Sequence, residues 1–406
     1  MDTQTWLDTD YVQRILRKAG KDESIQVSSI TVKPATAKGD NYTSDMHRVS
    51  AVLTRIMKGH NVTETKSFIA KIAPQGARGE MISKARYFET EMAVMSETLP
   101  LMNNLLAEVG TTPLAAQCLH VQYQDPVHLI IEDLTPEAFR MADRLAGLDL
   151  DHCLLAIRNL AIFHASSVAL TEKNPEAVTK YKEGIFHKNR PSTLTAMFKL
   201  GTQTLAKQVA EWSELSPRIA EKILNLSETI YEKGCEAALF REEDFNVLNH
   251  GDFWINNMLF QYDNQQKPVG YRFVDFQVCH YGSPAVDILF FFGTSPSDEI
   301  RMHYREFILR EYHVTLTGTM AKLECSTEAP NFDTLQEMLR KRALYEVVVA
   351  FTLLPLVLVD KSKVKSLDDL ASSDKKYDRP AYEGKSYRKV ITRLLPLYDG
   401  MGLLDV

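Results

Sequence analysis

HGDFWINN, at residues 250–257, places Asp252 five residues before Asn257. Two runs with the apolar pattern of short strands follow, and the turn-forming residues 263–268, DNQQKP, separate them. The sequence VDFQ, which contains Asp275, comes at the end of the second run. A hairpin is therefore expected, and it would fold Asp275 back beside Asn257.

An acid and two hard oxygen ligands at the mouth of a hairpin are what phosphoryl transfer requires. In that reaction one aspartate accepts the proton of the attacking hydroxyl, while an asparagine and a second aspartate hold Mg²⁺ against the nucleotide phosphates. The Asp-x4-Asn spacing is that of protein kinases. However, Gly251 replaces the arginine that precedes the aspartate there, and Gln277 replaces the glycine of Asp-Phe-Gly. These two differences favour a kinase for small molecules.

The same region offers a second interpretation as a metal centre. His250, Asp252, Asp275 and His280 could together form a zinc or iron site. The spacing of Asp252 and Asn257 and the lack of a second histidine pair favour Mg²⁺, which prefers oxygen ligands. His250 is therefore expected to brace the loop rather than to carry a proton.

These motifs, together with GSPAVDI at 282–288, resemble those of the aminoglycoside and choline kinase superfamily. Within it they resemble the ecdysteroid kinase-like family of insects. Three further stretches are similar to that family: KGDNYTSDMHRV at 38–49, EDLTPEAFRMADR at 132–144 and LAIFHASSVAL at 160–170. The likeness extends over residues 30–400, and the ordered set of motifs is more specific than any one of them.

The resemblance implies an α+β, protein-kinase-like fold of two lobes. The N-lobe, an antiparallel sheet with one main helix that binds the nucleotide, is expected at residues 1–131. A hinge follows at 132–136, and a mostly helical C-lobe at 137–406. The C-lobe would carry the catalytic loop at 250–257 and the metal-binding segment at 273–277.

Hydrophobic patterning predicts the N-lobe elements. Strands are expected at residues 25–31, 46–57, 65–72, 111–124 and 127–131. A helix is expected to begin near Phe88 and to end at Pro100. In the C-lobe, the buried face of a helix near 154–168 includes His164, which is expected to be a core residue. Asp287 is expected to brace the catalytic loop, as it does in the superfamily that the chain resembles.

Lys71 lies among apolar residues in the strand SFIAKI at 67–72. A buried ammonium group without a partner is costly, so a carboxylate is expected beside it. Glu91 matches the Phe-x-x-Glu pattern of the family that the chain resembles, and Glu89 is the alternative if the helix register differs by two. The resemblance implies that Lys71 holds the α and β phosphates of ATP while Glu91 orients it. An exposed strand lysine and a solvated glutamate are the other interpretation.

Two further ATP-binding segments are implied by the resemblance. The turn at 37–44 would cover the phosphates, with Gly39 and Ser44 as binding residues, although its single glycine also fits an ordinary hairpin turn. Glu132 and Leu134 would meet the adenine edge at the hinge, or they could simply end a strand.

The resemblance also implies the reaction. Asp252 would act as the catalytic residue, Asn257 and Asp275 would bind Mg²⁺, and ATP would donate its γ-phosphoryl group to a small-molecule alcohol. The acceptor would be an ecdysteroid or another steroid or xenobiotic alcohol, whose phosphorylation would inactivate and solubilise it. A choline or sugar kinase of the same superfamily and a catalytically inactive ligand-binding relative stay open as alternatives.

Composition limits the classes of partner. A net charge of −6 over 406 residues gives no electrostatic reason to expect nucleic acid or an anionic membrane as a partner. The longest apolar run, 347–359, is too short to span a bilayer. Five scattered cysteines and an N-terminus without an apolar core predict a cytoplasmic protein. A monomer is expected.

Overall fold

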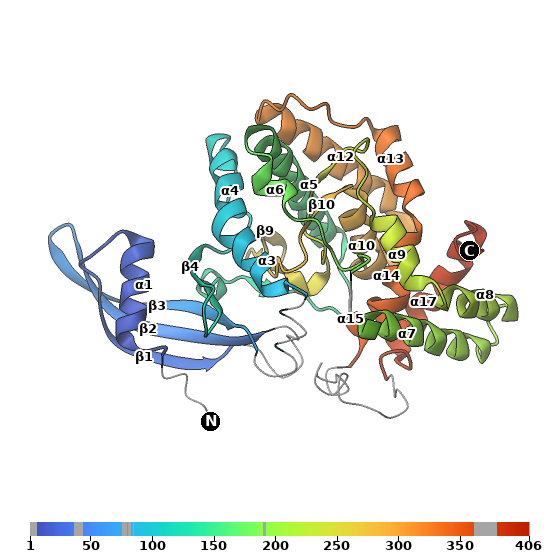
Figure 1. Ribbon diagram of the computed structural model, residues 1–406, viewed down its shortest axis with the longest axis horizontal. Coiled ribbons are helices and arrows are strands. Elements are labelled where there is room, and N and C mark those ends of the chain that lie inside the picture. The colour runs from blue at the N-terminus through green and yellow to red at the C-terminus, as the bar shows by residue number, and fades with distance from the viewer. Residues whose placement is uncertain are drawn as a thin grey trace.

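The computed structural model describes residues 6–35, 44–74, 79, 83, 85–189, 192–360 and 380–405, without the side chains of 192–194. Two lobes lie side by side along the long axis of the molecule (Figure 1). The N-lobe is built on one antiparallel sheet, and the C-lobe is mostly helical. This is the α+β, two-lobed, protein-kinase-like fold that the sequence predicted. The exact lobe boundaries, at residues 131 and 136, stay predictions.

The N-lobe sheet has the strand order β1-β2-β3-β5-β4, and each neighbouring pair is antiparallel. Its strands are β1 (Gln26–Pro34), β2 (Asp45–Met57), β3 (His60–Ile72), β4 (Cys118–Gln122) and β5 (His128–Glu132). The prediction of a strand over 111–124 is wrong for its first half. There, the carbonyl group of Leu114 accepts a hydrogen bond from the amide of Phe273, so the chain pairs with the C-lobe and not with this sheet.

Helix α1 (Thr9–Gly20) covers the sheet. Asp8 caps its N-terminus by accepting a hydrogen bond of 2.7 Å from the amide of Tyr11. The apolar face of α1 packs onto inward-facing side chains of β2 and β3, which alternate along each strand. These residues form a small core of their own, separate from the core of the C-lobe.

One continuous helical stretch joins the lobes. It consists of α3 (Tyr87–Ala93), a single π-helical turn, η1 (Val94–Thr98), and α4 (Leu99–Glu108). The prediction that this helix ends at Pro100 is wrong. Pro100 lies in the first turn of α4, where a residue without an amide proton is tolerated. The π-helical turn η1 comes directly before α4, so the helical stretch continues through this point. The buried side chains of the stretch belong to the C-lobe core.

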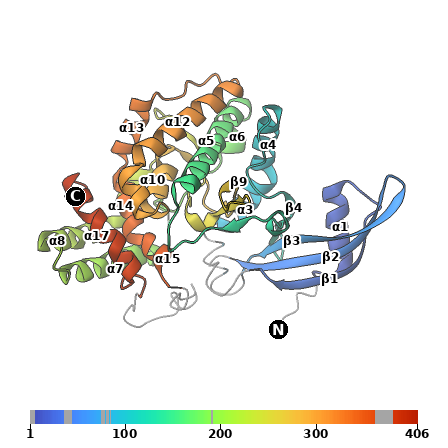
Figure 2. The same ribbon diagram turned by 180° about the vertical axis from the view of Figure 1, so that it is seen from behind.

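The C-lobe is organised around the long helix α5 (Leu150–Lys173), against which α12 (Arg305–Lys322) packs, as Figure 2 shows from behind. The fully buried helix α10 (Ala285–Thr294) lies inside the lobe. The other helices are α6 (Glu176–Thr179), α7 (Ser192–Ala210), α8 (Pro217–Ser227), α9 (Ile230–Ala238), α11 (Asp298–His303), α13 (Phe332–Lys341), α14 (Leu344–Thr352), α15 (Leu354–Leu358) and α17 (Lys385–Gly400).

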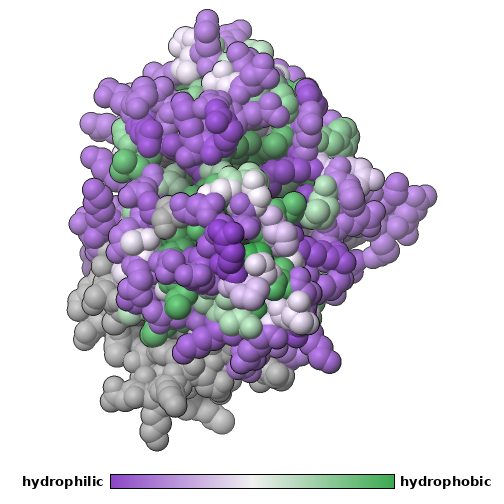
Figure 3. Space-filling view, turned by 90° about the vertical axis from the view of Figure 1, so that its right-hand side faces the viewer, coloured by the Kyte–Doolittle hydropathy of each residue, from purple (hydrophilic) through white to green (hydrophobic). Residues whose placement is uncertain are grey.

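Helix α5 is the one helix among the described residues that is long and apolar enough to cross a membrane. However, 72% of its most apolar window is buried inside the protein, as expected for the core helix of a globular domain. Figure 3 shows the end of the C-lobe that faces right in Figure 1. Hydrophilic side chains cover most of this face, and small hydrophobic patches lie between them.

The predicted hairpin is confirmed. Strands β8 (Met258–Tyr262) and β9 (Pro268–Phe273) pair antiparallel, and the amide of Val274 donates a hydrogen bond of 3.1 Å to the carbonyl of Asn257. Asp263 stabilises the turn by accepting hydrogen bonds from two amides within it. The two-residue strand β6 (Arg140–Met141) adds a third strand beside β8. A separate pair of short strands, β7 (Val247–Asn249) and β10 (His280–Gly282), holds the start of the 250–257 loop.

Candidate active site

A buried lysine connects the two lobes. The ammonium group of Lys71, on β3, lies 2.6 Å from a carboxylate oxygen of Glu91 on α3 and 2.7 Å from Oδ1 of Asp275. Lys71 and Glu91 are each only 4% exposed. Glu89, the alternative partner, does not contact Lys71: one of its carboxylate oxygens is buried without a hydrogen-bond partner among the described residues. The lysine partner that the sequence motif indicated is therefore the one observed.

This cluster perturbs the ionisation of its own members. Burial disfavours the charged form of Lys71, but Asp275 and Glu91 outweigh it and hold the pKa of the ammonium above its usual range. Burial raises the pKa of the Glu91 carboxyl to about 7, although the charge of Lys71 acts in the opposite direction. Lys71 therefore stays protonated, and one cation serves two carboxylates.

Asp252 and Asn257 lie next to this cluster. The side-chain amide of Asn257 donates hydrogen bonds of 2.9 Å to Oδ2 and to the backbone carbonyl of Asp252. The short 3₁₀ turn η3 (Ile255–Asn257) sets this geometry by folding Asn257 back over the loop. Burial and then the negative charge of Asp275 raise the pKa of Asp252 to about 7. A carboxyl group with that pKa can take up and release a proton near neutral pH.

Two backbone positions fix the approach of the 250–257 loop to the segment that carries Asp275. Asp275 has a φ of +69°, in the left-handed region that few residues other than glycine adopt. Such strain is typical of functional sites. Gly251 has a φ of +81°, and a Cβ atom there would lie 2.2 Å from the carbonyl oxygen of Val278. The glycine that replaces the kinase arginine is therefore a requirement of the backbone.

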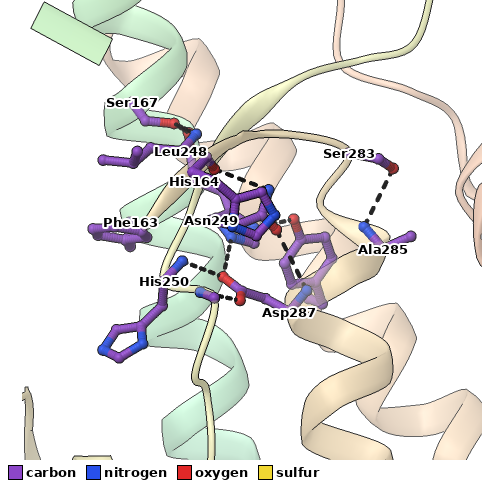
Figure 4. Close-up of polar contacts among 12 residues, drawn as sticks. Phe163, His164, Ser167, Leu248, Asn249, His250, Ser283, Ala285 and Asp287 are labelled. Atoms are coloured by element: carbon purple, nitrogen blue, oxygen red, sulfur yellow. Dashed lines mark hydrogen bonds and ion pairs between the residues drawn. The ribbon is translucent and has the colours of Figure 1, made fainter. Parts of the chain in front are cut away.

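Asp287 braces the 250–257 loop, as expected (Figure 4). Its carboxylate accepts hydrogen bonds from the amides of His250, at 2.6 Å, and Gly251, at 2.8 Å. His164 lies 3.1 Å from the same carboxylate and 2.7 Å from the hydroxyl group of Tyr312. Burial alone would raise the pKa of Asp287, but these hydrogen bonds hold it below its usual range. His164 is fully buried, which confirms it as a core residue.

His250 also has a structural position. Its Nε2 lies 3.0 Å from the carbonyl oxygen of Val274, and its ring stacks on Phe273. Burial lowers the pKa of His250, so the imidazole stays neutral and Nε2 donates this hydrogen bond. The contact ties the 250–257 loop to the segment that carries Asp275. This agrees with the prediction of a bracing residue.

The hinge is fixed by residues that the sequence analysis did not find. Asp133 accepts hydrogen bonds from Ser67 Oγ at 2.6 Å, from Arg48 Nε at 2.8 Å and from the amide of Thr135 at 3.1 Å. These contacts join the hinge to β2 and β3. No local motif indicates the contacts with Arg48 and Ser67, because only the pairing of the strands brings these two side chains beside Asp133. The Asn249 side chain, which accepts a hydrogen bond from the Asp287 amide, was missed for the same reason.

The remaining predicted ATP-binding residues are Gly39, Ser44, Glu132 and Leu134. Ser44 is buried next to Asp45, and Asp45 pairs with Ile72, one residue from Lys71. Glu132 is the last residue of β5. Leu134 follows the strand and packs into a small apolar cluster. Gly39 lies outside the described residues, as does most of the expected phosphate loop.

The donor set fits a magnesium ion better than zinc or iron. The described residues contain no group of three or more His, Cys, Asp or Glu side chains that could hold a metal ion. What they bring together is an amide and two carboxylates, the hard oxygen ligands that Mg²⁺ uses when nucleotide phosphates complete its shell. Burial is the main cause of the raised pKa values of Asp252 and Glu91, and the negative charge of Asp275 adds to it; a divalent cation held here would oppose that charge.

Comparison with known proteins gives one clear result. No curated protein matches the chain. The model of the ecdysteroid kinase-like family matches residues 38–325, a range that contains every residue of the candidate site. The match covers well over half of the chain and supports a kinase-like phosphotransferase. The chain belongs to the ecdysteroid kinase-like family.

Proposed function

We propose that the protein is an ATP- and Mg²⁺-dependent kinase that transfers the γ-phosphoryl group of ATP to a hydroxyl group of a small molecule. The observation that carries this proposal is the buried contact of Lys71 with both Glu91 and Asp275, adjacent to Asp252. A binding protein has no physical need for a buried, strained and partly repulsive cluster of this composition. A phosphotransferase needs each part of it.

Each residue has a defined role in this proposal. Lys71, oriented by Glu91, holds the α and β phosphates, while Asn257 and Asp275 hold Mg²⁺. Asp252 accepts the proton of the attacking hydroxyl group. The hydroxyl oxygen forms a bond with the γ-phosphorus, and the bond between that phosphorus and ADP breaks. Gly39 and Ser44 cover the phosphates, and the backbone at Glu132 and Leu134 meets the adenine. Bound Mg²⁺ neutralises charge on the phosphate oxygens.

The pKa of Asp252 supports its role as a base. A general base works best when its pKa is close to the operating pH, because it is then ionised and still basic enough to hold the transferred proton. At about 7, the pKa of Asp252 meets this condition. An ordinary exposed aspartate, with a pKa near 3.8, would be a weaker base.

For the acceptor, we propose an ecdysteroid or a related steroid or xenobiotic alcohol, in line with the family to which the chain belongs. Phosphorylation would make such a compound soluble and inactive. We further propose that the protein acts as a cytoplasmic monomer without a nucleic-acid or membrane partner. Choline and sugars are the alternative acceptors, since the phosphate-handling residues would be the same for them.

The test is ADP release from Mg-ATP by the wild-type protein and by Asp252→Asn. It would use a panel of ecdysteroids, choline, sugars and apolar alcohols, with mass spectrometry of the products. A phosphorylated steroid that forms with wild type and not with the variant supports the proposal. Phosphocholine or a sugar phosphate would replace the acceptor class and keep the mechanism. Failure of the wild type to bind Mg-ATP would contradict the kinase and favour an inactive ligand-binding relative.

A further inference from the structure

A second cavity lies in the C-lobe, and none of its lining residues belongs to the candidate active site. It has a volume of about 490 Å³, within the range of small-molecule pockets. The loop before α5, the segment from α10 to α11, and helices α15 and α17 enclose it. Helices α15 and α17 lie side by side at this point (Figure 1).

The cavity is lined by more positive than negative charge. Four permanent cations and two carboxylates face it: Arg144, Arg301, Lys389, Arg393, Asp298 and Glu299. Asp298 is shared between Lys389, at 3.7 Å, and Arg393, at 3.1 Å. Glu299 is exposed at the rim. The lining therefore has two unbalanced positive charges, which favours a ligand with a negative charge.

Arg301 is the central feature of this cavity. Its side chain is only 7% exposed, and its Nε donates a hydrogen bond of 2.9 Å to the carbonyl of Phe292. Among the described residues, this is the one side-chain hydrogen bond of Arg301, and Glu346 and Asp298 act on its charge without forming an ion pair with it. The nearby Glu346 is already bound by Arg305 at 2.7 Å. A buried guanidinium group normally has an anionic partner, so this one has room for an external oxyanion.

The other walls of the cavity define the rest of the ligand. Ser386 lines it from the first turn of α17, a 16-residue helix whose N-terminus has no capping side chain. Free amides at a helix N-terminus add to the attraction for an anion. Leu354, Leu358 and Val390 supply an apolar wall. The ligand that these walls suit has an apolar body and an oxyanion head group.

We propose that this cavity binds a small amphipathic anion, a phosphomonoester or a carboxylate, whose head group pairs with Arg301. The cavity is a second binding site, and the proposal does not depend on the kinase assignment. Arg301 presents a planar fork of donors, which suits both phosphate and carboxylate head groups. The apolar wall then adds affinity for a hydrophobic body over a bare inorganic ion.

Calorimetric titration of the full chain with phenyl phosphate, benzoate, inorganic phosphate and benzyl alcohol tests this proposal. We expect phenyl phosphate or benzoate to bind more tightly than inorganic phosphate, and benzyl alcohol not to bind. The stronger of the two aromatic anions identifies the head group as phosphate or carboxylate. Arg301→Gln should weaken that binding roughly ten- to hundredfold, the effect of losing a charge-assisted bidentate contact.

Matched variants separate this cavity from the active site. Asp252→Asn should leave the affinity unchanged, and Glu299→Gln should increase it about two- to threefold by removing a negative charge at the rim. Should Arg301→Gln fail to fold, Lys389→Gln with Arg393→Gln replaces it, because both side chains are more than half exposed. Either set must weaken binding. The proposal is overturned if no oxyanion binds at millimolar concentration, or if Asp252→Asn abolishes binding while the cavity variants keep it.

Discussion

Two aspartates, the half-buried Asp252 and the fully buried Asp287, have pKa values shifted in opposite directions. The pKa of Asp287 is held below its usual range because two backbone amides and His164 satisfy its carboxylate. The pKa of Asp252 is raised to about 7, since burial and the neighbouring charge of Asp275 outweigh its hydrogen bond with the Asn257 side chain. Asp287 therefore holds the 250–257 loop in place, and the loop presents Asp252.

The contrast shows how a structural charge differs from a reactive one. A buried carboxylate that is fully hydrogen-bonded stabilises the fold and stays ionised. A buried carboxylate next to a like charge destabilises the protein when no ligand is bound. Such carboxylates are found where the chemistry of a site requires them. Lys71 belongs to the second kind of environment, because it is shared between two acids whose charges exceed its own.

The largest expected effect comes from Asp252. Asp252→Asn removes the proposed base, so phosphoryl transfer should fall about 10²- to 10⁴-fold, the usual contribution of general base catalysis. The melting temperature should stay the same or rise, because the substitution also removes a repulsion with Asp275. ADP release and thermal unfolding measure the two quantities. Full activity in a folded variant would exclude Asp252 as the base.

Asp287 should behave in the opposite way. Asp287→Ala leaves the amides of His250 and Gly251 and the His164 ring without their acceptor. The free energy of unfolding should fall by about 3–5 kcal/mol, the range for removing one partner from a buried charged network. Urea denaturation measures it, with the exposed Asp333→Ala as a control that should change stability little. A variant as stable as wild type would show that the brace is not structural.

A smaller effect should separate Glu91 from Glu89. Glu91→Gln weakens the hold on Lys71, and we expect kcat/KM to fall about tenfold or more, as for the loss of one charge-assisted contact. Glu89→Gln, on the same helix, should leave kcat/KM within about twofold, because Glu89 does not touch Lys71. Equal losses in both variants would argue against the pairing.

The pH dependence of stability should show the least specific effect, because two carboxyl groups contribute to it. The raised pKa of Asp252 means that the folded protein keeps a proton between about pH 4 and 7 that the unfolded chain releases. The free energy of unfolding therefore falls as the pH rises through this window, by about 1.4 kcal/mol for each unit of pKa shift. Asp252→Asn should make this fall shallower without abolishing it, because Glu91 contributes in the same direction. Denaturation at several pH values checks the sign, and a steeper fall in the variant would refute it.

Sequence was sufficient where the signal is local. The hairpin could be predicted because its turn residues and strands are contiguous. An acid beside Lys71 was expected because a buried lysine needs one, but the choice of Glu91 over Glu89 came from the resemblance to the family. The prediction of a helix end at Pro100 was wrong, because a proline in the first turn of one helix cannot be distinguished in the sequence from a proline at the end of another. The irregular course of 111–117 depends on a contact with Phe273, which no local pattern encodes.

Contacts between distant segments could not be predicted where the resemblance to the family did not indicate them. The requirement for Gly251 comes from the carbonyl of Val278, and the partners of Asp133 on β2 and β3, Arg48 and Ser67, lie 85 and 66 residues before it. The role of Arg301 could not be predicted either, because its side chain lines a cavity that forms only when the segments from α10 to α17 pack together. Sequence therefore predicted Asp287 and His250 as bracing residues and missed Asn249 and Asp133, while the roles of Asp252, Asn257 and Asp275 stay predictions.

The most direct test of the central claim is calorimetric titration of ATP, with and without Mg²⁺, into wild type, Asp275→Asn and Lys71→Met. We predict that wild type binds ATP more tightly with Mg²⁺, that Asp275→Asn loses this dependence on Mg²⁺, and that Lys71→Met weakens binding in both conditions. Wild-type protein that binds no ATP, or binds it equally well with and without Mg²⁺, would contradict the assignment of this buried cluster as a magnesium-nucleotide site.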